Sequence, residues 1–468
     1  MPFNSFLDYP MSWKPERDKL RLPLYLALAE QLEKDIAAGC LAPGTRLPPQ
    51  RELADFLDIH FTTVTRAYRL CELKGLIYAV TGSGTFVAPN AAKSVTISAD
   101  NSLHERVDLG FVSSFESCNE MLADTIAAVA KKRRVSALLN YESPTGMQHQ
   151  RAAGSVWLQN IGLNVDPEHL VIVSGTQNGL ALVLLALFEP GNRIAVDPFT
   201  YANFIELAKL HHLQLVPVAG DSEGMRADEL EAQHRLNPLH GVFLMPSCCN
   251  PTTVMISERR KKELASVITK HRLILIEDDI HAFFTAGIVP DYQGPIFRFA
   301  PEQTVYLSGT SKPICSGLRV AYLAFPERFR AQLLKAVFNV NVKTSSLDAE
   351  IITQLILSGT AQQIVERKRR LAEQANVLFD DYFPNMAPTG HPLSFYRWLP
   401  ICDKRPGTQM EQTLLQAGIR VYHSDRFLVG ARKTQPYLRV ALSTAESPAQ
   451  LEKGLQILSQ ASCFRPQR

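Results

Sequence analysis

The segment Val305-Tyr306-Leu307-Ser308-Gly309-Thr310-Ser311-Lys312 is followed closely by Ser316-Gly317-Leu318-Arg319-Val320-Ala321-Tyr322-Leu323. Two short apolar runs flank a loop of small residues, which predicts two strands joined by a loop that presents one lysine. A lysine in a tight, partly desolvated loop can lose its proton and form a Schiff base with a carbonyl group. Arg319 would then offer a planar pair of donors to a phosphate. Each residue alone is equally compatible with a surface lysine and a strand-edge arginine.

Alternating strands and helices precede this segment. Leu170–Val173 reads as a buried strand, the run from Ser174 to Gly179 as a small-residue turn, and Leu180–Phe188 as a buried helix. A turn that leads into a helix presents unpaired N–H groups and the positive end of the helix dipole. The pattern predicts a mostly parallel sheet with a phosphate site, although any loop between a strand and a helix has these features.

Three acidic residues follow another predicted strand, Leu273–Ile276, in the order Glu277-Asp278-Asp279, with His281 shortly after them. A carboxylate at the carboxyl end of a strand can keep a pyridine nitrogen protonated and so make the ring an electron sink. With three candidates in a row, the pattern does not decide which one has this role.

Several short motifs together resemble the fold-type I aminotransferases: Asn140-Tyr141-Glu142-Ser143-Pro144-Thr145-Gly146, Asn250-Pro251-Thr252 and the lysine segment itself. The resemblance implies pyridoxal 5'-phosphate bound to Lys312 and a smaller C-terminal α/β region. It assigns the cofactor phosphate to Gly175, Thr176, Gln177, Ser311 and Arg319, the ring stacking to Tyr201, the phenolic oxygen to Asn250 and His281, the pyridine nitrogen to Asp279 with Asp278 second, the neighbouring subunit's phosphate to Tyr141, and a substrate carboxylate to Arg439.

Two departures from that family are visible. Thr253 stands where the family has glycine, so the turn after Asn250 is expected to differ. His281 takes the place of the family tyrosine. A neutral imidazole still donates one hydrogen bond, but its protonation is expected to vary around neutral pH.

The first ninety residues have another pattern. Apolar residues at helical spacing begin after Pro23, a second helix begins after Pro48-Pro49, and a third runs from Thr62 to Lys74. Leu76–Val80 and Thr85–Ala88 flank a Gly-rich hairpin tip. The segments resemble the winged helix-turn-helix of the GntR family, which implies binding of double-stranded DNA in the grooves. The resemblance places Arg51, Thr62, Thr63, Arg66 and Gly82 at the DNA.

The balance of charges in the first ninety residues predicts weak binding to DNA. Residues 1–90 hold ten Lys and Arg against ten Asp and Glu, and Phe61 and Val80 stand where family members often have arginine. Binding is therefore expected to be modest and strongly salt-sensitive, unless a dimer doubles the contacts. We predict the DNA-binding domain at 20–90, a linker at 91–106 that lets the two domains move independently, and the aminotransferase-like domain at 107–468.

Composition limits the cellular compartment and the kinds of partner that we expect. The net charge is +3, the eight cysteines form no CxxC pair, and no apolar run approaches the length of a membrane span. Residues 1–20 are polar and are expected to be loose, without an apolar leader segment. We expect a cytoplasmic protein with no metal site and no membrane contact.

The two blocks occur in the order of the MocR/GabR subfamily of GntR regulators, which the chain resembles over nearly its whole length. This implies a homodimeric transcription regulator that senses an amine, an amino acid or pyridoxal phosphate itself through the Lys312 Schiff base. The alternative is a metabolic pyridoxal phosphate-dependent aminotransferase with an appended DNA-binding module, since partial transamination activity fits the same residues.

Overall fold

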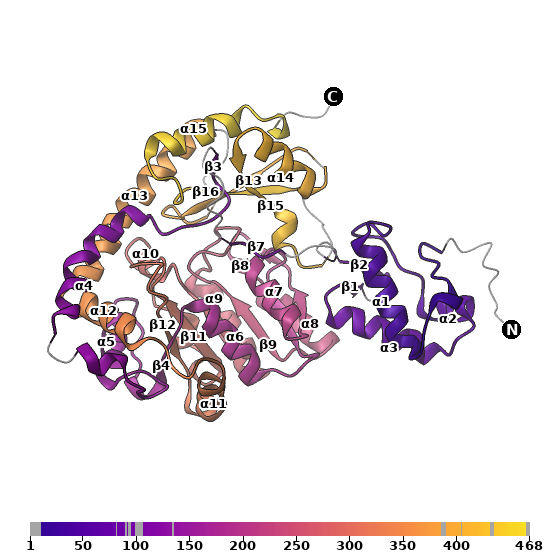
Figure 1. Ribbon diagram of the computed structural model, residues 1–468, viewed down its shortest axis with the longest axis horizontal. Helices are drawn as coiled ribbons and strands as arrows, with labels where there is room; N and C mark the ends of the chain where they lie inside the picture. The colour runs from indigo at the N-terminus through magenta and orange to yellow at the C-terminus, as the bar shows by residue number, and fades with distance from the viewer. Residues whose placement is uncertain are drawn as a thin grey trace.

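The computed structural model describes residues 11–80, 82–88, 91, 95–98, 106–132, 135–384, 390–403, 405–430 and 435–464. Figure 1 shows three parts: a winged helix drawn in indigo, a large α/β region beside it, and a smaller C-terminal region that ends in yellow. The predicted fold class, a winged helix-turn-helix joined to an α/β domain with a mostly parallel sheet, is confirmed.

The winged helix has clear sequence causes. Its third helix begins where the His60 side chain accepts a hydrogen bond from Thr62 N–H, and its helical end is followed by Gly75 at φ +68°. Val64 and Tyr68 are at most 1% exposed in its core. The elements are α1 (Leu24–Ala37), α2 (Gln50–Leu57), α3 (Phe61–Leu73) and the antiparallel pair β1 (Ile77–Val80) and β2 (Gly84–Val87).

The segment before α1 is packed, so the prediction of a loose N-terminal stretch was wrong for residues 11–20. Met11, Trp13 and Leu20 are buried in the winged-helix core, and Trp13 Nε1 donates to Asp35 Oδ2 at 2.7 Å. Three isolated apolar side chains produce no periodicity, yet they are enough to cover the side of a helix. Residues 1–10 lie outside the described residues.

The linker is held as well, where the structure describes it. Val95 and Ile97 are 3% and 8% exposed and pack into the core of the large domain. Asn203 in α7 (Ala202–Leu210) accepts from Ile97 N–H at 2.8 Å and donates to Ile97 O at 3.1 Å. Glu206 accepts from Val95 N–H at 3.1 Å. Independent movement of the domains, which the polar composition of the linker predicted, is therefore not supported at residues 95–97.

The winged helix also contacts α7 directly. A Cβ atom on Gly75 would lie 2.9 Å from Lys209 Cγ, and Figure 1 shows the two parts side by side. Lys209 in turn pairs with Glu206 at 3.0 Å. One helix of the large domain therefore contacts both the linker and the winged helix.

A seven-stranded sheet forms the centre of the large domain, in the order β4-β12-β11-β10-β9-β5-β6. Only β12 runs antiparallel to its neighbours β11 and β4. The strands are β4 (Leu170–Val173), β5 (Arg193–Val196), β6 (Gln214–Pro217), β9 (Gly241–Leu244), β10 (Ile274–Asp278), β11 (Thr304–Gly309) and β12 (Ala321–Ala324).

Helices cover both faces of this sheet, because side chains alternate along each strand. In β10, Ile276 packs with α6, α7 and α11 on one face, and Leu275 packs with α8 and α9 on the other. Helices α5, α10 and α12 pack over β4, β11 and β12. The further helices are α4 (Ala123–Ala130), α5 (Gln148–Gln159), α6 (Thr176–Leu187), α8 (Ala227–Leu236), α9 (Glu258–Lys270), α10 (Ala282–Thr285), α11 (Arg330–Asn341) and α12 (Ser346–Leu357).

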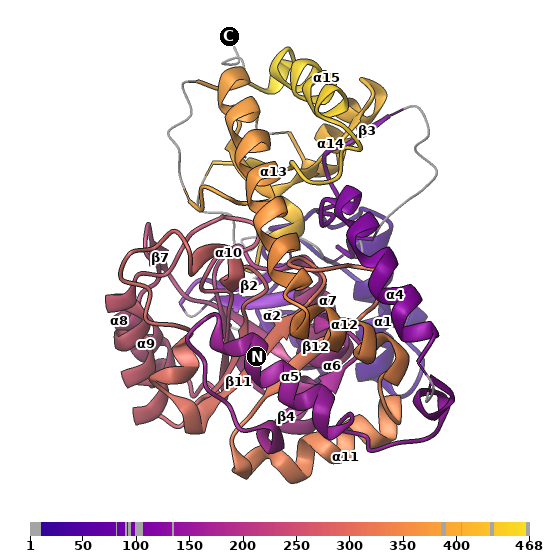
Figure 2. The same ribbon diagram turned by 90° about the vertical axis from the view of Figure 1, so that its left-hand side faces the viewer.

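The C-terminal region is joined to the large domain by α13 (Thr360–Tyr382), which Figure 2 shows running from one into the other. Ala372 of α13 belongs to the core of the large domain and Phe379 to that of the C-terminal region. The region is made of β3 (Val107–Asp108), β13 (Tyr396–Pro400), β14 (Ile419–Arg420), β15 (Tyr422–His423), β16 (Tyr437–Ala441), α14 (Gly407–Gln416) and α15 (Pro448–Ser459).

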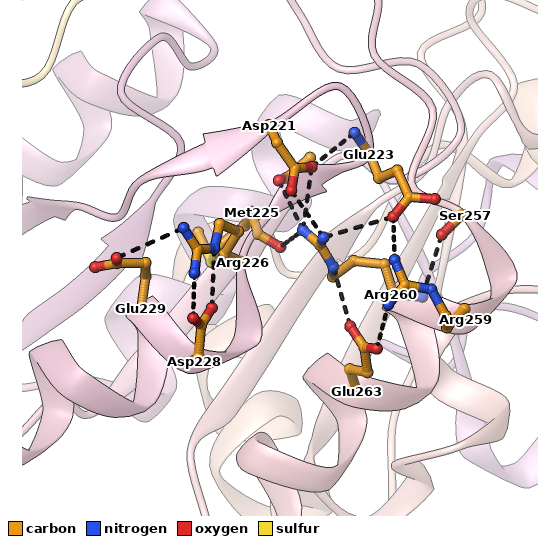
Figure 3. A network of polar contacts seen from close by, with 11 residues as sticks. Asp221, Glu223, Met225, Arg226, Asp228, Glu229, Ser257, Arg259, Arg260 and Glu263 are labelled. Atoms are coloured by element: carbon orange, nitrogen blue, oxygen red, sulfur yellow. Dashed lines mark hydrogen bonds and ion pairs between the residues drawn. The ribbon is translucent and has the colours of Figure 1, made fainter.

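A network of ion pairs fixes a small hairpin, β7 (Gly220–Asp221) with β8 (Gly224–Met225), to α9. The buried Arg260 guanidinium pairs with Asp221 at 2.9 Å and with Glu263 at 3.1 Å, and it donates to Met225 O. Figure 3 shows this arrangement. The Nε, Nη1 and Nη2 atoms of Arg260 each donate to an acceptor. The network therefore has a structural role.

Within the described residues, no helix is both long and apolar enough to cross a lipid bilayer. The same residues contain no group of three His, Cys, Asp or Glu side chains placed to hold a metal ion.

Candidate cofactor site and nucleic-acid interface

Lys312 lies in the loop between β11 and β12, as its sequence context predicts. Its Nζ donates to Val112 O and, at 3.2 Å, to Ser113 O, both in the segment that follows β3. Burial, followed by the charges of the nearby Lys368 and Arg439, lowers the pKa of Lys312 to about 7. A large fraction of this amine is therefore neutral, and nucleophilic, at physiological pH.

An anion cradle lies at the start of α6. Gly175 precedes the helix at φ +85°, and a Cβ on it would lie only 2.5 Å from Arg319 Nη2. Arg319 Nη1 also donates to Ser311 Oγ at 3.1 Å. Thr176 lies against the end of β11, where a Cβ on Gly309 would be 2.6 Å from its Oγ1. The structure thus gathers one guanidinium, two hydroxyls and a helix N-terminus.

Tyr201 and Gln177 are brought together beside this cradle. The Tyr201 hydroxyl donates to Gln177 Oε1 at 3.2 Å. Burial raises the pKa of Tyr201 to about 12, with a smaller contribution from the negative charge of Asp278. The ring therefore stays neutral, and Asp278 faces the same space.

The three acidic residues after Ile276 separate onto two faces of the sheet. Glu277 accepts from Ile296 N–H at 2.7 Å and from Phe297 N–H at 2.9 Å. Asp279 accepts from Ser247 N–H at 3.1 Å and from Ser247 Oγ–H at 2.9 Å. Asp278 points the other way, and its Oδ1 is buried without a hydrogen-bond partner among the described residues.

The pKa values of these carboxyl groups follow from burial. Burial, together with the charge of Asp279, raises the pKa of Asp278 to about 8. Burial also raises the pKa of Asp279, against the lowering effect of Lys261 and of the Ser247 bonds. Asp278 is thus an unsatisfied buried acid beside Tyr201, whereas Asp279 is already bonded. Side chains alternate between the two faces of a strand, so the sequence itself could have indicated that Asp278 and Asp279 point in opposite directions.

His281 is 2% exposed, and neither ring nitrogen has a hydrogen-bond partner within the described chain. Burial lowers its pKa well below the ordinary value, and His391 and Lys312 lower it further. A pKa lowered in this way disfavours the imidazolium, so the structure does not support the expectation that His281 changes protonation around neutral pH. An uncharged ring with two unsatisfied nitrogens remains able to donate one hydrogen bond.

Asn250 and Arg439 meet directly. Arg439 Nη1 donates to Asn250 Oδ1 at 3.0 Å and its Nη2 donates to Gly110 O at 2.6 Å. Arg439 is 2% exposed, and its Nε is buried without a partner among the described residues. Burial lowers its pKa to about 10, so it remains a cation. Thr253, in place of glycine, takes φ +62°, so the turn after Asn250 has a conformation that favours glycine.

Tyr141 is the predicted site residue that lies apart on the surface, where 89% of it is exposed. A side chain so placed is open to a second copy of the chain. By contrast, Arg151 near the same motif is internal and donates to Thr145 Oγ1 and to Glu168 Oε1.

A cavity of about 1480 Å³ opens beside the site rather than at Lys312 itself. It is bordered by the segment after β3, by α13 and by the loop after β16, and Ser113, whose carbonyl accepts from Lys312, is part of its wall. The position of the chemical groups, and not cavity size, therefore identifies the site.

The candidate DNA-binding side chains lie on the winged-helix surface. Arg51, Thr62 and Arg66 are exposed and Thr63 is half-buried. The Arg66 guanidinium lies 3.9 Å from the centre of the Tyr25 ring, and that of Arg51 lies 5.9 Å from the Phe61 ring.

Gly82, at the tip of the wing, has φ +76° and open space around it. Thr81, the first residue of the Gly-rich hairpin tip, lies outside the described residues.

Sequence reasoning missed two polar contacts of the site. Ser247 donates two hydrogen bonds to the Asp279 carboxylate. Lys368 in α13 donates to Lys312 O and to Ile314 O. Neither residue lies in a motif. A lysine inside the long helical pattern before Tyr382 carries no signal that distinguishes it from a solvated charge.

Two family models match the chain. Residues 24–87 match the bacterial regulatory proteins of the gntR family, and residues 114–458 match aminotransferase class I and II. The uncharacterized HTH-type transcriptional regulator YdeF of Bacillus subtilis is 33% identical over 98% of this chain and 98% of its own. The probable rhizopine catabolism regulatory protein MocR of Rhizobium meliloti is 24% identical over 76% of each chain.

Solved structures match the large domain. An archaeal alanine:glyoxylate aminotransferase has a TM-score of 0.69 at 18% identity, over 76% of this chain and 90% of that chain. A kynurenine aminotransferase of Pyrococcus horikoshii in complex with PMP has a TM-score of 0.67 at 17% identity, with the same coverage. At these identities the likeness shows the fold.

Proposed function

The chain belongs to the MocR group of gntR-type regulators, which join a helix-turn-helix domain to an aminotransferase class I and II domain, and on this premise we propose that it is a pyridoxal phosphate-dependent transcription regulator. Its winged helix binds a double-stranded DNA operator in the cytoplasm. Its large domain holds the cofactor on Lys312 and senses an amine, an amino acid or the cofactor itself.

One observation carries the cofactor proposal: buried polar atoms without partners belong to residues whose charges interact with Lys312, a lysine with a lowered pKa, or with its neighbour in the site, Tyr201. These atoms are Asp278 Oδ1, both ring nitrogens of His281 and Arg439 Nε. Leaving such a group unsatisfied costs about 1–3 kcal/mol. A bound ligand with a pyridine nitrogen, a phenolic oxygen and an anionic group would remove that cost, so the residues present fit pyridoxal phosphate.

The roles follow from position. Gly175, Thr176, Gln177, Ser311 and Arg319 would hold the phosphate at the start of α6. Tyr201 would stack on the ring, and Asn250 and His281 would face the phenolic oxygen. We assign the pyridine nitrogen to Asp278 in place of Asp279, because Asp279 is already bonded to Ser247. When bound, the cofactor supplies an aldehyde that exchanges amines and an electron sink.

Arg439 would bind the carboxylate of an amino acid effector. Its buried guanidinium has no carboxylate partner within ion-pair distance among the described residues and already shares one donor with Asn250. A carboxylate at this place would form charge-assisted bonds with the guanidinium. The amine of the same molecule would then lie on the Lys312 side of the site.

Tyr141 supports a homodimer. Tyr141 is 89% exposed and therefore accessible to a second copy of the chain, and in the proposed dimer it would reach the phosphate cradle of the other subunit. Sedimentation of the purified protein and of Tyr141→Ala, with and without pyridoxal phosphate, tests this step.

The central experiment is reductive trapping. Protein mixed with pyridoxal phosphate should be yellow, lose its visible band on treatment with borohydride, and yield a labelled peptide that contains Lys312. Lys312→Ala should lose the label and keep its fold, as judged by DNA binding. A label on another lysine would refute the assignment.

The DNA-binding half has its own test. Sequencing of the genomic fragments that the protein retains, with and without pyridoxal phosphate, should return one enriched motif in at least one condition. Retention of random fragments in both conditions would refute operator binding.

Lys312, with a pKa of about 7, together with Arg439, also favours a second function, transamination with turnover. This aminotransferase function predicts steady release of a keto acid from an amino donor in the presence of a keto acid acceptor. A single half-transamination without further turnover would support the regulator function instead.

A further inference from the structure

A second lysine is bonded to the loop that carries Lys312. Lys368 of α13 is 0% exposed, and its Nζ donates to Lys312 O at 2.9 Å and to Ile314 O at 2.8 Å. These two carbonyl groups lie on either side of Pro313. The ammonium group therefore holds, by two hydrogen bonds, the loop from which the Lys312 side chain extends. Three helical turns of α13 beyond this contact reach the C-terminal region.

Packing alone does not explain a charged side chain in this position. Among the described residues, no carboxylate lies within ion-pair distance of Lys368 Nζ, and burial of an unpaired ammonium is costly. A methionine of similar length would fill the same space without that cost. The charge, or the two carbonyl bonds, must therefore serve the loop.

We propose that Lys368 is a positioning residue for Lys312, which fixes its loop through two carbonyl bonds and disfavours protonation of its amine through a second positive charge. The inference rests on the proposed role of Lys312 as the amine that binds an aldehyde cofactor.

The electrostatics agree with the geometry. The pKa of Lys312 is lowered to about 7 by burial first and by Lys368 next. Burial also lowers the pKa of Lys368, to about 8, so at pH 7 most of the charge stays on Lys368.

The other ionisable groups around the two amines come from several elements. Those that affect Lys312 or Lys368 are Arg439 of β16, Arg319 and Cys315 of the same loop, Glu116 and Cys118 of the 3-10 turn Glu116–Leu122, and His281 after β10. Glu116 and the two cysteines act in the opposite direction to the cations, and Glu116 is bonded to Ser316 Oγ.

The affected step is addition of an amine to an aldehyde. The lone pair of Lys312 Nζ forms a bond to the aldehyde carbon, protons pass from nitrogen to oxygen, and the oxygen leaves as water while the carbon–nitrogen double bond forms. Only the unprotonated amine has this lone pair. The rate below the pKa therefore falls tenfold for each unit by which the pKa rises.

The experiment measures the Lys312 pKa without relying on the cofactor. Full-length protein is acetylated with trace acetic anhydride at pH 5.5 to 10, and the modified fraction of the Lys312 peptide is read by mass spectrometry against an exposed reference lysine. In parallel, the rate of imine formation with pyridoxal phosphate is followed by absorbance over the same range.

Three variants separate bonds from charge. Lys368→Met removes both, Lys368→Gln keeps an amide donor without the charge, and Lys368→Arg keeps the charge. Both Met and Gln should raise the midpoint of Lys312 labelling by about one pH unit and slow imine formation at pH 6 about tenfold. Lys368→Arg should stay near the wild-type midpoint.

Unchanged midpoints in both Lys368→Met and Lys368→Gln, in protein that still binds DNA, would overturn the proposal. A shift in Met but not in Gln would overturn the charge effect. Absence of a Lys312 adduct in wild type would refute the proposed function instead, while the labelling midpoints would still decide the role of Lys368.

Discussion

The winged helix and the proposed cofactor site hold their candidate functional side chains in opposite surroundings. Arg51, Thr62 and Arg66 are exposed on a closed core, whereas Asp278 and Arg439 are each 2% exposed. DNA brings its own water and counter-ions, so a protein cation that meets it need not be buried beforehand. A small ligand is bound in a desolvated site, where each polar atom must be fixed in advance.

Because of this difference, burial and hydrogen bonding identify candidate residues in the large domain but not on the winged helix. In the proposed cofactor site, buried polar atoms without partners and displaced pKa values mark candidate functional residues. On the winged helix, Arg66 over the Tyr25 ring looks like any solvated arginine. Its assignment to DNA rests on family membership, while Lys312 and Arg439 have a physical mark as well.

The largest expected effect concerns Arg439. If it binds the effector carboxylate, Arg439→Ala should abolish the change in operator affinity that amino acids cause in wild type, a coupling of typically about 1–3 kcal/mol. Operator affinity without effector should not change. The measurement is a titration of operator binding at several amino acid concentrations. A full response in Arg439→Ala would contradict the carboxylate assignment, and a response to amines that lack a carboxylate would point elsewhere.

The second effect is acid lability confined to the large domain. Burial lowers the pKa of His391 to about 4, and its ring bonds Thr285 Oγ1 at 2.8 Å. Between its ordinary value near 6.5 and 4, the unfolded chain takes up a proton that the folded chain refuses. Stability should therefore fall as the pH drops through this window, by about 1.4 kcal/mol per unit, or about 2 kcal/mol at pH 5.

Urea unfolding at pH 7 and pH 5 measures this loss, with Trp157 reporting on the large domain, Trp398 on the C-terminal region and Trp13 on the winged helix. His391→Gln keeps a donor for Thr285 and should reduce the pH dependence by the share that His391 contributes. His281, whose pKa is also lowered by burial, adds in the same direction. An equal slope in His391→Gln and wild type would show that His391 is not the cause.

The third effect tests the exposed half. Arg51→Ala and Arg66→Ala should each weaken operator binding and reduce the salt slope by about 0.9 for each phosphate that the variant no longer neutralises. Stability should change by no more than about 1 kcal/mol, since an exposed cation–π contact contributes about 0.5–1 kcal/mol. Phe61→Arg is the matched opposite and should steepen the slope. Unchanged slopes in the double alanine variant would place the DNA elsewhere.

Much of the architecture was predictable because it depends on local patterns. Leu170–Val173 is a strand with the predicted bounds, and the third helix of the winged helix differs by one residue at each end. Apolar periodicity, a proline pair and glycines at turns are written in consecutive residues. The lysine loop between two strands follows from the same kind of signal.

The remaining features depend on contacts between distant residues. Asp278 and Asp279 differ in their hydrogen bonds because Ser247, more than thirty positions away, donates to Asp279 alone. Burial lowers the pKa of His281, and composition cannot show this because it does not tell which residues surround the ring. Trp13 and Ile97 looked like parts of polar segments, yet each finds an apolar surface on another element.

The smallest effect concerns the connection between the two halves. Asn203 makes two hydrogen bonds with Ile97, and its carbonyl accepts from Gln177 Nε2 at 3.5 Å. Gln177 in turn accepts from Tyr201, so contiguous contacts join the cofactor site to the linker within one chain. A net contribution of about 1 kcal/mol for these bonds implies that Asn203→Ala opens the linker about fivefold more often.

Limited proteolysis of the linker, 91–106, should therefore be about fivefold faster in Asn203→Ala, while the core of either domain is cut at the wild-type rate. Leu210→Ala, an exposed position on the same helix, is the control and should leave the rate unchanged. An equal linker cleavage rate in Asn203→Ala would mean that burial of Val95 and Ile97 alone holds the linker. If cleavage accelerates and the effector still changes operator affinity fully, the two halves communicate through the contact of Gly75 with Lys209, or through a second subunit, and not through the linker.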